Sequence, residues 1–120
     1  MDRNGWTTFA SKEPTRSDCL DDWLLVWHVY RGAISVRWED RQKTPMITHW
    51  QRMPKEGWIS AAERKPTRAD ADIMGCVLAM NLYDGIRVTG WRQFDYDRYM
   101  MCWLPTPGEP EDHPEHFKRF

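Results

Sequence analysis

Two stretches of the chain are almost continuously apolar over the length of a strand, and they occupy corresponding places in its two halves. Residues 23–30 read Trp-Leu-Leu-Val-Trp-His-Val-Tyr, and residues 76–83 read Cys-Val-Leu-Ala-Met-Asn-Leu-Tyr. A strand with so few polar positions is typical of one buried on both faces. We therefore expect each stretch to be the central strand of a β-sheet.

Each central strand is followed by a turn and a return strand. Arg31-Gly32 and Asp84-Gly85 have the composition of hairpin turns, because glycine accepts a positive φ without a steric penalty. In the second return strand the apolar alternation falls out of phase with Trp91. A bulge at Gly90 would restore the phase, since one extra residue moves the following side chains to the opposite face.

The remaining elements are short. Helical turns are expected at residues 15–18, at their counterpart 67–70, and at 60–63, where the spacing fits a capping box. Residues 46–54 and 99–107 combine an apolar stretch with a closing proline. Each is predicted to be a last strand that runs into an extended exit.

The halves correspond residue by residue, which indicates an internal duplication. Gly5-Trp6 returns as Gly57-Trp58, and the Thr-Arg-x-Asp segment that begins at Thr15 returns at Thr67 with the same offset. The offset then grows by one residue, and the later matches are Tyr30, Gly32, Trp38, Trp50 and Pro54 with Tyr83, Gly85, Trp91, Trp103 and Pro107. Most of the eight tryptophans are thus explained by one small motif used twice.

We predict a mainly β fold, with a small α+β fold as the alternative. It consists of two duplicated antiparallel β-meander units with short helical turns, packed as one pseudo-twofold domain because each unit alone buries little apolar surface. The first unit is expected at residues 1–56 and the second at 57–108. Residues 109–120 are polar and contain two prolines, which predicts a mobile tail.

Composition excludes several classes of function. The 120 residues carry 17 Lys and Arg against 18 Asp and Glu, a net charge of −1. This balance disfavours a nucleic-acid mimic and a basic nucleic-acid coat, which need a one-sided electrostatic field. The three cysteines lack Cys-x-x-Cys spacing, so we expect reduced thiols, and no apolar run is long enough to span a membrane. These features favour a soluble, intracellular protein.

Catalytic and metal-binding patterns are not found in the sequence. No phosphate loop, nucleophile elbow or catalytic Cys-His motif is recognised, so we expect a protein that is not an enzyme and needs no cofactor. His113 and His116 have ligand-like spacing but lie in the expected tail, where nothing rigid would fix a metal. His28 and His49 lie on predicted strands, and their counterparts are Asn81 and Cys102, which favours structural or hydrogen-bonding roles over catalysis.

Tryptophan and arginine neighbours allow two interpretations. The pairs Arg37-Trp38 and Trp91-Arg92, and Arg52 close to Trp50, would suit stacking of a base beside a guanidinium group. Repeated tryptophans in a small β unit are more often its core, which is the interpretation we favour. Trp23 and Trp27 have no tryptophan counterparts in the second half, so they belong to a larger core or to a partner-binding face.

The duplicated arginines are a second candidate. Arg16 and Arg68 occupy equivalent positions and could present two cations to one anionic ligand. The alternative is that the neighbouring threonines cap short turns while the arginines pair with surface carboxylates.

At this level of detail the chain resembles the domain-of-unknown-function family 551, short proteins common in phages and prophages. The resemblance rests on Gly57-Trp58-Ile59-Ser60 with Lys65-Pro66, on Val77-Leu78, on the Tyr-x-Gly turns, and on Ile47-Thr48-His49-Trp50 with Pro54. It covers nearly all of residues 5–107, once in each half. Two departures stand out: Cys102 replaces the histidine expected before Trp103, and Gln51-Arg52 stand where the family has Met-Pro.

The resemblance implies a phage-type accessory protein in the host cytoplasm, with no established chemistry. We expect a non-catalytic protein that acts by binding in counter-defence, either sequestering a nucleotide-like immune signal or occluding a host defence protein. A single-stranded nucleic-acid-binding module and a small phage enzyme are the alternatives, and a homo-oligomer is compatible with either mechanism. The candidate binding residues are Arg16, Arg68, Trp23, Trp27, His28, Tyr30, Arg37, His49, Tyr83 and Arg92.

Overall fold

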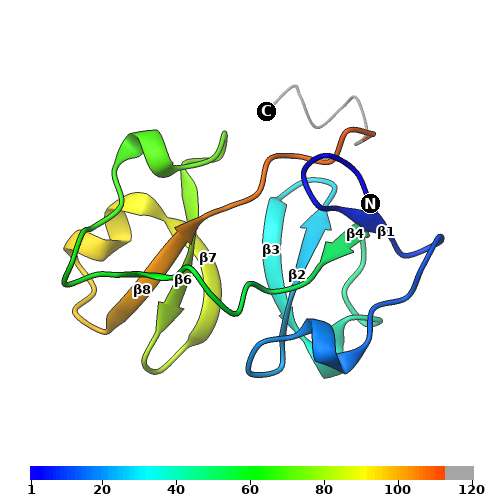
Figure 1. Cartoon of the computed structure of the whole chain (residues 1–120), viewed down its shortest axis with the longest axis horizontal. Helices are drawn as coiled ribbons and strands as arrows, with labels where there is room; N and C mark the ends of the chain where they lie inside the picture. The colour runs from blue at the N-terminus through cyan, green and yellow to red at the C-terminus, as the bar shows by residue number, and fades with distance from the viewer. Residues whose placement is uncertain (113–120) are drawn as a thin grey trace. The chain divides into compact units, whose positions relative to one another are not determined.

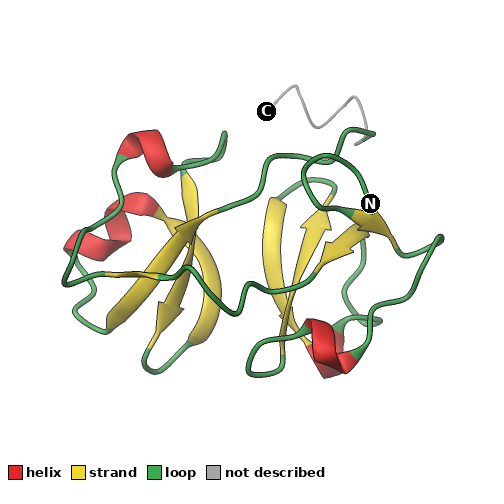
Figure 2. Cartoon of the chain, viewed as in Figure 1, coloured by secondary structure: helices red, strands yellow, loops and turns green. Residues whose placement is uncertain are grey.

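The computed structural model describes residues 1–112 and shows a mainly β protein, as predicted (Figures 1 and 2). The chain divides into unit 1, formed by Met1–Met53 and Pro107–Phe120, and unit 2, formed by Pro54–Thr106. Each unit contains one antiparallel four-stranded sheet. The expected packing of one unit against the other stays a prediction.

Unit 1 places a long apolar strand at the centre of its sheet. Its strands are β1 (Thr7–Thr8), β2 (Trp23–His28), β3 (Gly32–Arg37) and β4 (Ile47–Gln51), in the order β1-β4-β2-β3. β2 is buried from Trp23 to Trp27, which agrees with its nearly continuous apolar sequence. The order differs from a simple meander, because β4 pairs with β2 and not with its sequence neighbour β3.

Unit 2 repeats this arrangement strand for strand. Its strands are β5 (Ile59–Ser60), β6 (Cys76–Asn81), β7 (Gly85–Gly90) and β8 (Met100–Pro105), in the order β5-β8-β6-β7. Even the irregularities recur: the register against the last strand shifts between Trp27 and His28 in unit 1 and between Met80 and Asn81 in unit 2. The duplication seen in the sequence is therefore a duplication of structure.

The predicted bulge at Gly90 is wrong. Gly90 pairs with Cys76 in a continuous β6–β7 register, and its φ is negative. The alternation loses phase because Trp91 lies outside the strand, at the start of a 3-10 turn, and Trp38 does the same in unit 1. The chain leaves the sheet at this point, so strand periodicity no longer determines which way the tryptophan points.

The short turns are 3-10 helices: η1 (Arg16–Asp18), η2 (Trp38–Asp40), η3 (Arg68–Asp70) and η4 (Trp91–Asp95). η1 and η3 begin after Thr15 and Thr67, and each has the capping box that the sequence indicated. The helix expected at 60–63 is instead a turn, in which the Ser60 carbonyl accepts bonds from the amides of Glu63 and Arg64.

Each unit has a small core under one face of its sheet. In unit 1 it contains Leu24, Val26, Val36, Cys19 and Trp50. In unit 2 it contains Val77, Ala79, Phe94 and Trp103. The tryptophan of the last strand is thus a core residue in both units, which supports the core interpretation of the repeated tryptophans.

The chain after Thr106 packs onto unit 1 for at least six residues. The tail predicted to be mobile spans residues 109–120, but in its described part Pro110 is buried and Glu111 bonds to Arg3 and to Asp2. His113 and His116, the spacing-based metal candidates, lie outside the described residues.

Candidate functional site

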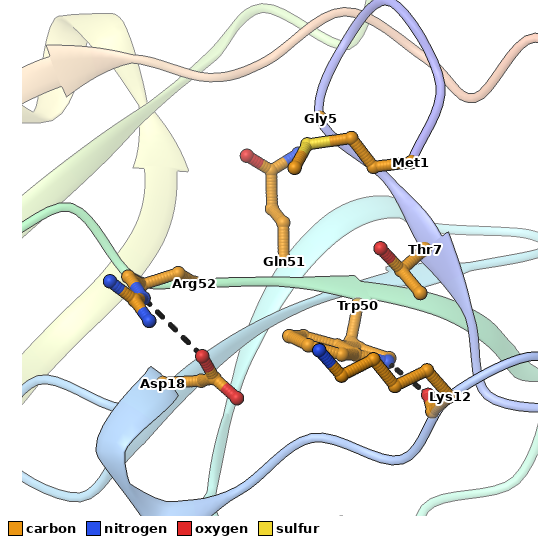
Figure 3. A pocket seen from close by; sticks show the side chains of 8 residues that line it. All are labelled: Met1, Gly5, Thr7, Lys12, Asp18, Trp50, Gln51 and Arg52. Atoms are coloured by element: carbon orange, nitrogen blue, oxygen red, sulfur yellow. Dashed lines mark hydrogen bonds and ion pairs between the residues drawn. The ribbon is translucent and has the colours of Figure 1, made fainter.

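A pocket of about 470 Å³ lies in unit 1 where β4 ends (Figure 3). This volume is within the range of roughly 300–1,000 Å³ that small-molecule sites occupy. Its lining combines one aromatic ring with charged and polar groups. The lining residues are Met1, Gly5, Thr7, Lys12, Asp18, Trp50, Gln51 and Arg52.

Trp50 fixes one wall of the pocket. It pairs with Thr7 of β1 and with Val26 of β2, so its backbone is held from both sides. Its indole Nε1 donates a 2.8 Å hydrogen bond to the carbonyl of Lys12, which ties the loop after β1 to the last strand. This bond therefore fixes the backbone of Lys12 beside the Trp50 indole.

Gln51 connects the pocket to the N-terminal loop. Its Nε2 donates to the carbonyl of Asn4 at 3.1 Å, and Figure 3 shows the side chain extending from β4 toward Gly5 and Met1. Gly5 has a φ of +90°, and a Cβ at this position would lie 3.1 Å from Gln51 Oε1. Glycine is needed here both for its backbone conformation and for the close approach of the amide.

Asp18 and Arg52 form the charged floor of the pocket. Arg52 Nε donates to Asp18 Oδ1 at 3.3 Å, and the amide of Thr15 donates to Asp18 Oδ2 at 2.8 Å. Burial by itself raises the pKa of Asp18, but the hydrogen bonds from Thr15 and Arg52 outweigh it and hold that pKa below its ordinary value. Asp18 is therefore an anion at neutral pH, and Arg52 compensates its charge.

The Lys12 ammonium is the uncompensated charge of the pocket. Within residues 1–112 its Nζ makes no hydrogen bond or ion pair, and the residue is exposed. In the view of Figure 3 the side chain runs past the Trp50 ring. With Asp18 and Arg52 balanced, the side chains of the lining carry one net positive charge, which suits an anionic group of a ligand.

Unit 2 has different residues at the equivalent positions. Arg64 corresponds to Lys12, and its guanidinium bonds to Asp70 through two nitrogens, at 3.0 and 3.4 Å, with Cζ 4.7 Å from the Trp103 ring. The polar lining is replaced as well: the counterparts of Thr7, Gln51 and Arg52 are Ile59, Leu104 and Pro105. In unit 2 the cation is already paired, whereas in unit 1 it is available.

The two duplicated arginines are in different situations. Arg16 forms a two-point ion pair with Asp22, at 3.1 and 2.9 Å, which raises the pKa of Arg16 and lowers that of Asp22. Arg68 is exposed and forms no ion pair with a described residue. For Arg16 the surface ion pair was the correct alternative.

Trp23 and Trp27 are core residues, each only 3% exposed. The Trp27 ring meets Trp6 edge to face with centroids 5.7 Å apart. Arg37 lies over the Trp23 ring at 4.7 Å and not over its sequence neighbour Trp38. The extra tryptophans of the first half therefore enlarge the core, and their rings are not exposed as a binding surface.

His28 supports a turn. Its Nδ1 accepts hydrogen bonds from the amides of Tyr30 and Arg31, at 3.1 and 3.2 Å, and burial together with the charge of Arg31 lowers its pKa. Asn81 Oδ1 does the same for Tyr83 and Asp84 in unit 2, at 2.9 and 3.2 Å. The structural role expected for His28 is confirmed by this shared geometry.

His49 is buried and contacts the C-terminal segment. Its Nε2 lies 2.8 Å from Asp112 Oδ1, and its Nδ1 lies 2.7 Å from the hydroxyl of Thr48. A second concavity of about 320 Å³ borders His49, Asp112 and the N-terminal loop. His49 does not line the pocket of Figure 3.

The remaining candidates are exposed and separate from the pocket. Tyr30 is 46% exposed and Tyr83 is 72% exposed, the latter packed edge to face on Tyr99 at 4.7 Å. Arg92 lies 5.2 Å over the ring of Trp91. None of the ten predicted residues is among those that line the pocket of Figure 3.

The pocket residues that sequence reasoning missed are Thr7, Lys12, Asp18 and Gln51. Trp50 and Arg52 had been considered together as a platform, which is the part of the pocket that adjacency in the sequence could indicate. The missing clue was a contrast between the halves: the polar residues Gln51 and Arg52 have the apolar residues Leu104 and Pro105 as counterparts.

Comparison of the chain with protein-family models, with curated proteins and with solved structures gives no match. The resemblance to family 551 accordingly stays a prediction. Among residues 1–112 no group of three or more His, Cys, Asp or Glu side chains could hold a metal ion. The same residues include no helix long and apolar enough to cross a membrane.

Proposed function

We propose that this protein is a non-catalytic binding protein whose pocket in unit 1 takes a small anionic, nucleotide-like molecule. The observation that carries the proposal is the Lys12 ammonium, which faces a pocket of suitable volume without an ion-pair partner among the described residues. An unpaired cation in a pocket of this size can bind the phosphate of a ring compound.

The charge of the lining and two polar side chains indicate which ligand fits the pocket. One net positive side-chain charge favours a phosphodiester over a polyphosphate, because additional negative charges would be repelled by Asp18. Gln51 and Thr7 supply polar atoms that can bond to the edge of a base. Sequestration of a nucleotide-like signal, as in phage counter-defence, is the biological role that such a pocket would serve.

The test uses 3′,5′-cyclic AMP and a panel of cyclic dinucleotides, with inorganic phosphate as the ring-free comparison. Nitrogen-15 NMR of the indole N–H groups is the readout, because Trp50 Nε1 is bonded to the Lys12 carbonyl at the pocket wall. Trp103 Nε1 makes the equivalent 2.8 Å bond to Arg64 in unit 2 and serves as an internal control. A saturable shift of Trp50 without a shift of Trp103 supports the proposal.

Two variants test whether binding needs only a positive charge at position 12 or a positive charge that has no ion-pair partner. Lys12→Gln removes the cation and should weaken binding about 10- to 100-fold, the range for a lost hydrogen bond to a charged group of ~1.5–3 kcal/mol. Lys12→Arg with Arg52→Pro copies unit 2, keeps a cation at position 12 and should pair it with Asp18, so binding should fall to a similar extent. Lys43→Gln, at another exposed lysine of unit 1, is the matched control and should bind like the wild type.

If no member of the panel shifts Trp50, or if the Lys12→Gln protein binds normally, the proposal is wrong. Affinity for single-stranded oligonucleotides that falls steeply with salt would instead favour the nucleic-acid alternative.

A second candidate function, docking to a host protein, is favoured by an exposed aromatic cluster in unit 2. Tyr83 packs edge to face on Tyr99, whose hydroxyl accepts a 2.9 Å bond from Arg98. Exposed tyrosine and arginine side chains held in place by one another are typical of interface hot spots. Tyr83→Ser should abolish a protein complex seen by native mass spectrometry, while Tyr30→Ser at the equivalent position of unit 1 should leave it intact.

A further inference from the structure

The N-terminal loop of unit 1 lines the pocket with some of its residues and binds the C-terminal segment with others. Met1 and Gly5 line the proposed binding pocket. Asp2, Arg3 and Asn4, from the same loop, bond to residues near the other end of the chain. One short loop thus forms the pocket wall on one side and a docking site on the other.

The docked segment, residues 107–112, is named the strap here. Trp6 Nε1 donates a 2.7 Å bond to the carbonyl of Gly108, and Asn4 Nδ2 donates a 2.8 Å bond to the carbonyl of Glu109. Pro110 is fully buried. The strap is therefore held by directed bonds and by packing, from its beginning to its middle.

The end of the strap is held by charged groups. Glu111 Oε1 accepts bonds from the amide of Arg3 at 2.6 Å and from its Nε at 3.2 Å. Asp112 Oδ1 lies 2.8 Å from Nε2 of His49, a side chain only 5% exposed on strand β4. Because β4 continues to Trp50 and Gln51, the strap is attached both to the loop and to the strand that form the pocket.

Unit 2 shows a shorter form of the same contact. Trp58, the counterpart of Trp6, donates from Nε1 to the carbonyl of Pro54 at 3.0 Å. His49 has Cys102 as its counterpart, and the Cys102 thiol lies 3.8 Å from the Met80 sulfur. The extended attachment through an imidazole and a carboxylate is specific to the unit that has the open pocket.

We infer that the strap positions the wall of the pocket, and that Trp6, His49 and Asp112 are positioning residues for the ligand proposed above. The expected effect on ligand binding rests on the proposed function. The attachment of the strap to the pocket wall rests only on contacts within unit 1. Release of the strap frees Asn4, whose carbonyl accepts from Gln51, and with it the rim formed by Gly5 and Met1. Occupancy of the strap and occupancy of the pocket are thereby coupled.

The experiment uses the full-length protein and Asp112→Ala. The Asp112 side chain is 69% exposed, so the variant is expected to fold. Glu39→Ala removes an exposed carboxylate elsewhere in unit 1 and is the matched control. Amide hydrogen exchange without any ligand is the first readout, and affinity for 3′,5′-cyclic AMP is the second.

In Asp112→Ala we expect faster exchange at the amides of residues 2–8 and 50–52. Cyclic AMP binding should weaken about three- to tenfold, less than for Lys12→Gln, because Asp112 acts on the pocket only through the strap. Faster exchange confined to the strap itself, or no change at all, would overturn the inference. If the wild type binds no nucleotide while exchange still rises at 2–8 and 50–52, the proposed function fails and the positioning role of the strap remains.

His49→Gln provides a second test at the other partner of the same contact. Glutamine keeps a polar group on β4 but removes the imidazole, so it should reproduce the Asp112→Ala exchange pattern. The double variant should be no more perturbed than either single variant, because both remove one interaction. Additive effects would show that His49 and Asp112 act separately, and would contradict the role of their contact in holding the strap.

Discussion

Unit 1 and unit 2 share one strand order, one pair of capping boxes and one bulge position, but they differ in how a single cation is used. In unit 2 Arg64 is bonded twice to Asp70 and lies over Trp103. In unit 1 the equivalent aspartate, Asp18, is bonded by Arg52, and Lys12 has no ion-pair partner among residues 1–112. Two copies of one fold can therefore differ in the ion-pair partners at equivalent positions, which leaves a cation available in one of them.

The largest expected effect is the loss of stability when the core tryptophan shared by the two units is removed. Trp103 is fully buried against Phe94, and Trp50 is 6% exposed in the matching core. Trp103→Ala and Trp50→Ala should each lower the free energy of unfolding by about 3–5 kcal/mol, the usual cost of emptying a tryptophan site. Urea unfolding followed by circular dichroism measures this.

Tyr96→Ala, at a side chain that is 80% exposed, is the control and should change stability by less than about 0.5 kcal/mol. A loss below about 1 kcal/mol in either tryptophan variant would mean that the shared tryptophan is not the core of its unit.

A smaller effect separates the two capping aspartates. Hydrogen bonds from Arg64 and from the Thr67 amide lower the pKa of Asp70, and in unit 1 the bonds from Thr15 and Arg52 overcome burial to lower that of Asp18. Asp18→Ala and Asp70→Ala should each cost about 0.5–2 kcal/mol, as lost caps do. The Asp18 variant should be the more costly, because Asp18 is the more buried of the two.

The pH dependence has a definite sign. Because the folded-state pKa of each aspartate lies below its ordinary value near 3.8, the stabilisation is present above that value and is lost as the pH falls through the lowered pKa. Urea midpoints between about pH 5 and 2 should fall less steeply in Asp18→Asn and Asp70→Asn than in the wild type. Parallel curves would show that these carboxylates contribute nothing to acid sensitivity.

The smallest effect tests whether His28 and Asn81 are interchangeable. His28→Asn should change stability by less than about 0.5 kcal/mol at pH 8, since an amide oxygen already supports the same turn in unit 2, whereas His28→Ala should cost about 1 kcal/mol.

Lowering the pH sharpens this test. Burial and Arg31 lower the folded-state pKa of His28, so the wild type should lose stability as the pH falls below the ordinary histidine value of about 6.5. The His28→Asn protein lacks this contribution, so the two curves should diverge toward acid pH, with the wild type losing more stability. Curves that stay parallel from pH 8 to 5 would contradict the assigned role.

The fold was predicted better than the binding site, and the difference has a physical origin. The strands, the 3-10 caps and the duplication depend on local periodicity and on spacing, and residues 23–28 and 76–81 form strands as the apolar pattern indicated. The ten candidate binding residues were chosen for their chemistry, and the fold scatters them because neighbouring positions in a strand point to opposite faces. Arg37, at the end of its strand, lies over Trp23 across the hairpin, whereas the adjacent Trp38 is already outside the strand in a 3-10 turn.

By itself, the sequence determined that this protein is a duplicated, mainly β chain with buried tryptophans, because alternation, turns and repeats are properties of consecutive residues. Only the tertiary structure decided which cation is unpaired, that Lys12 and Gln51 line one pocket with Trp50, and that residues 107–112 return to His49. These contacts join positions far apart in the chain. They depend on strand order and on ion-pair partners, which no local pattern of residues specifies.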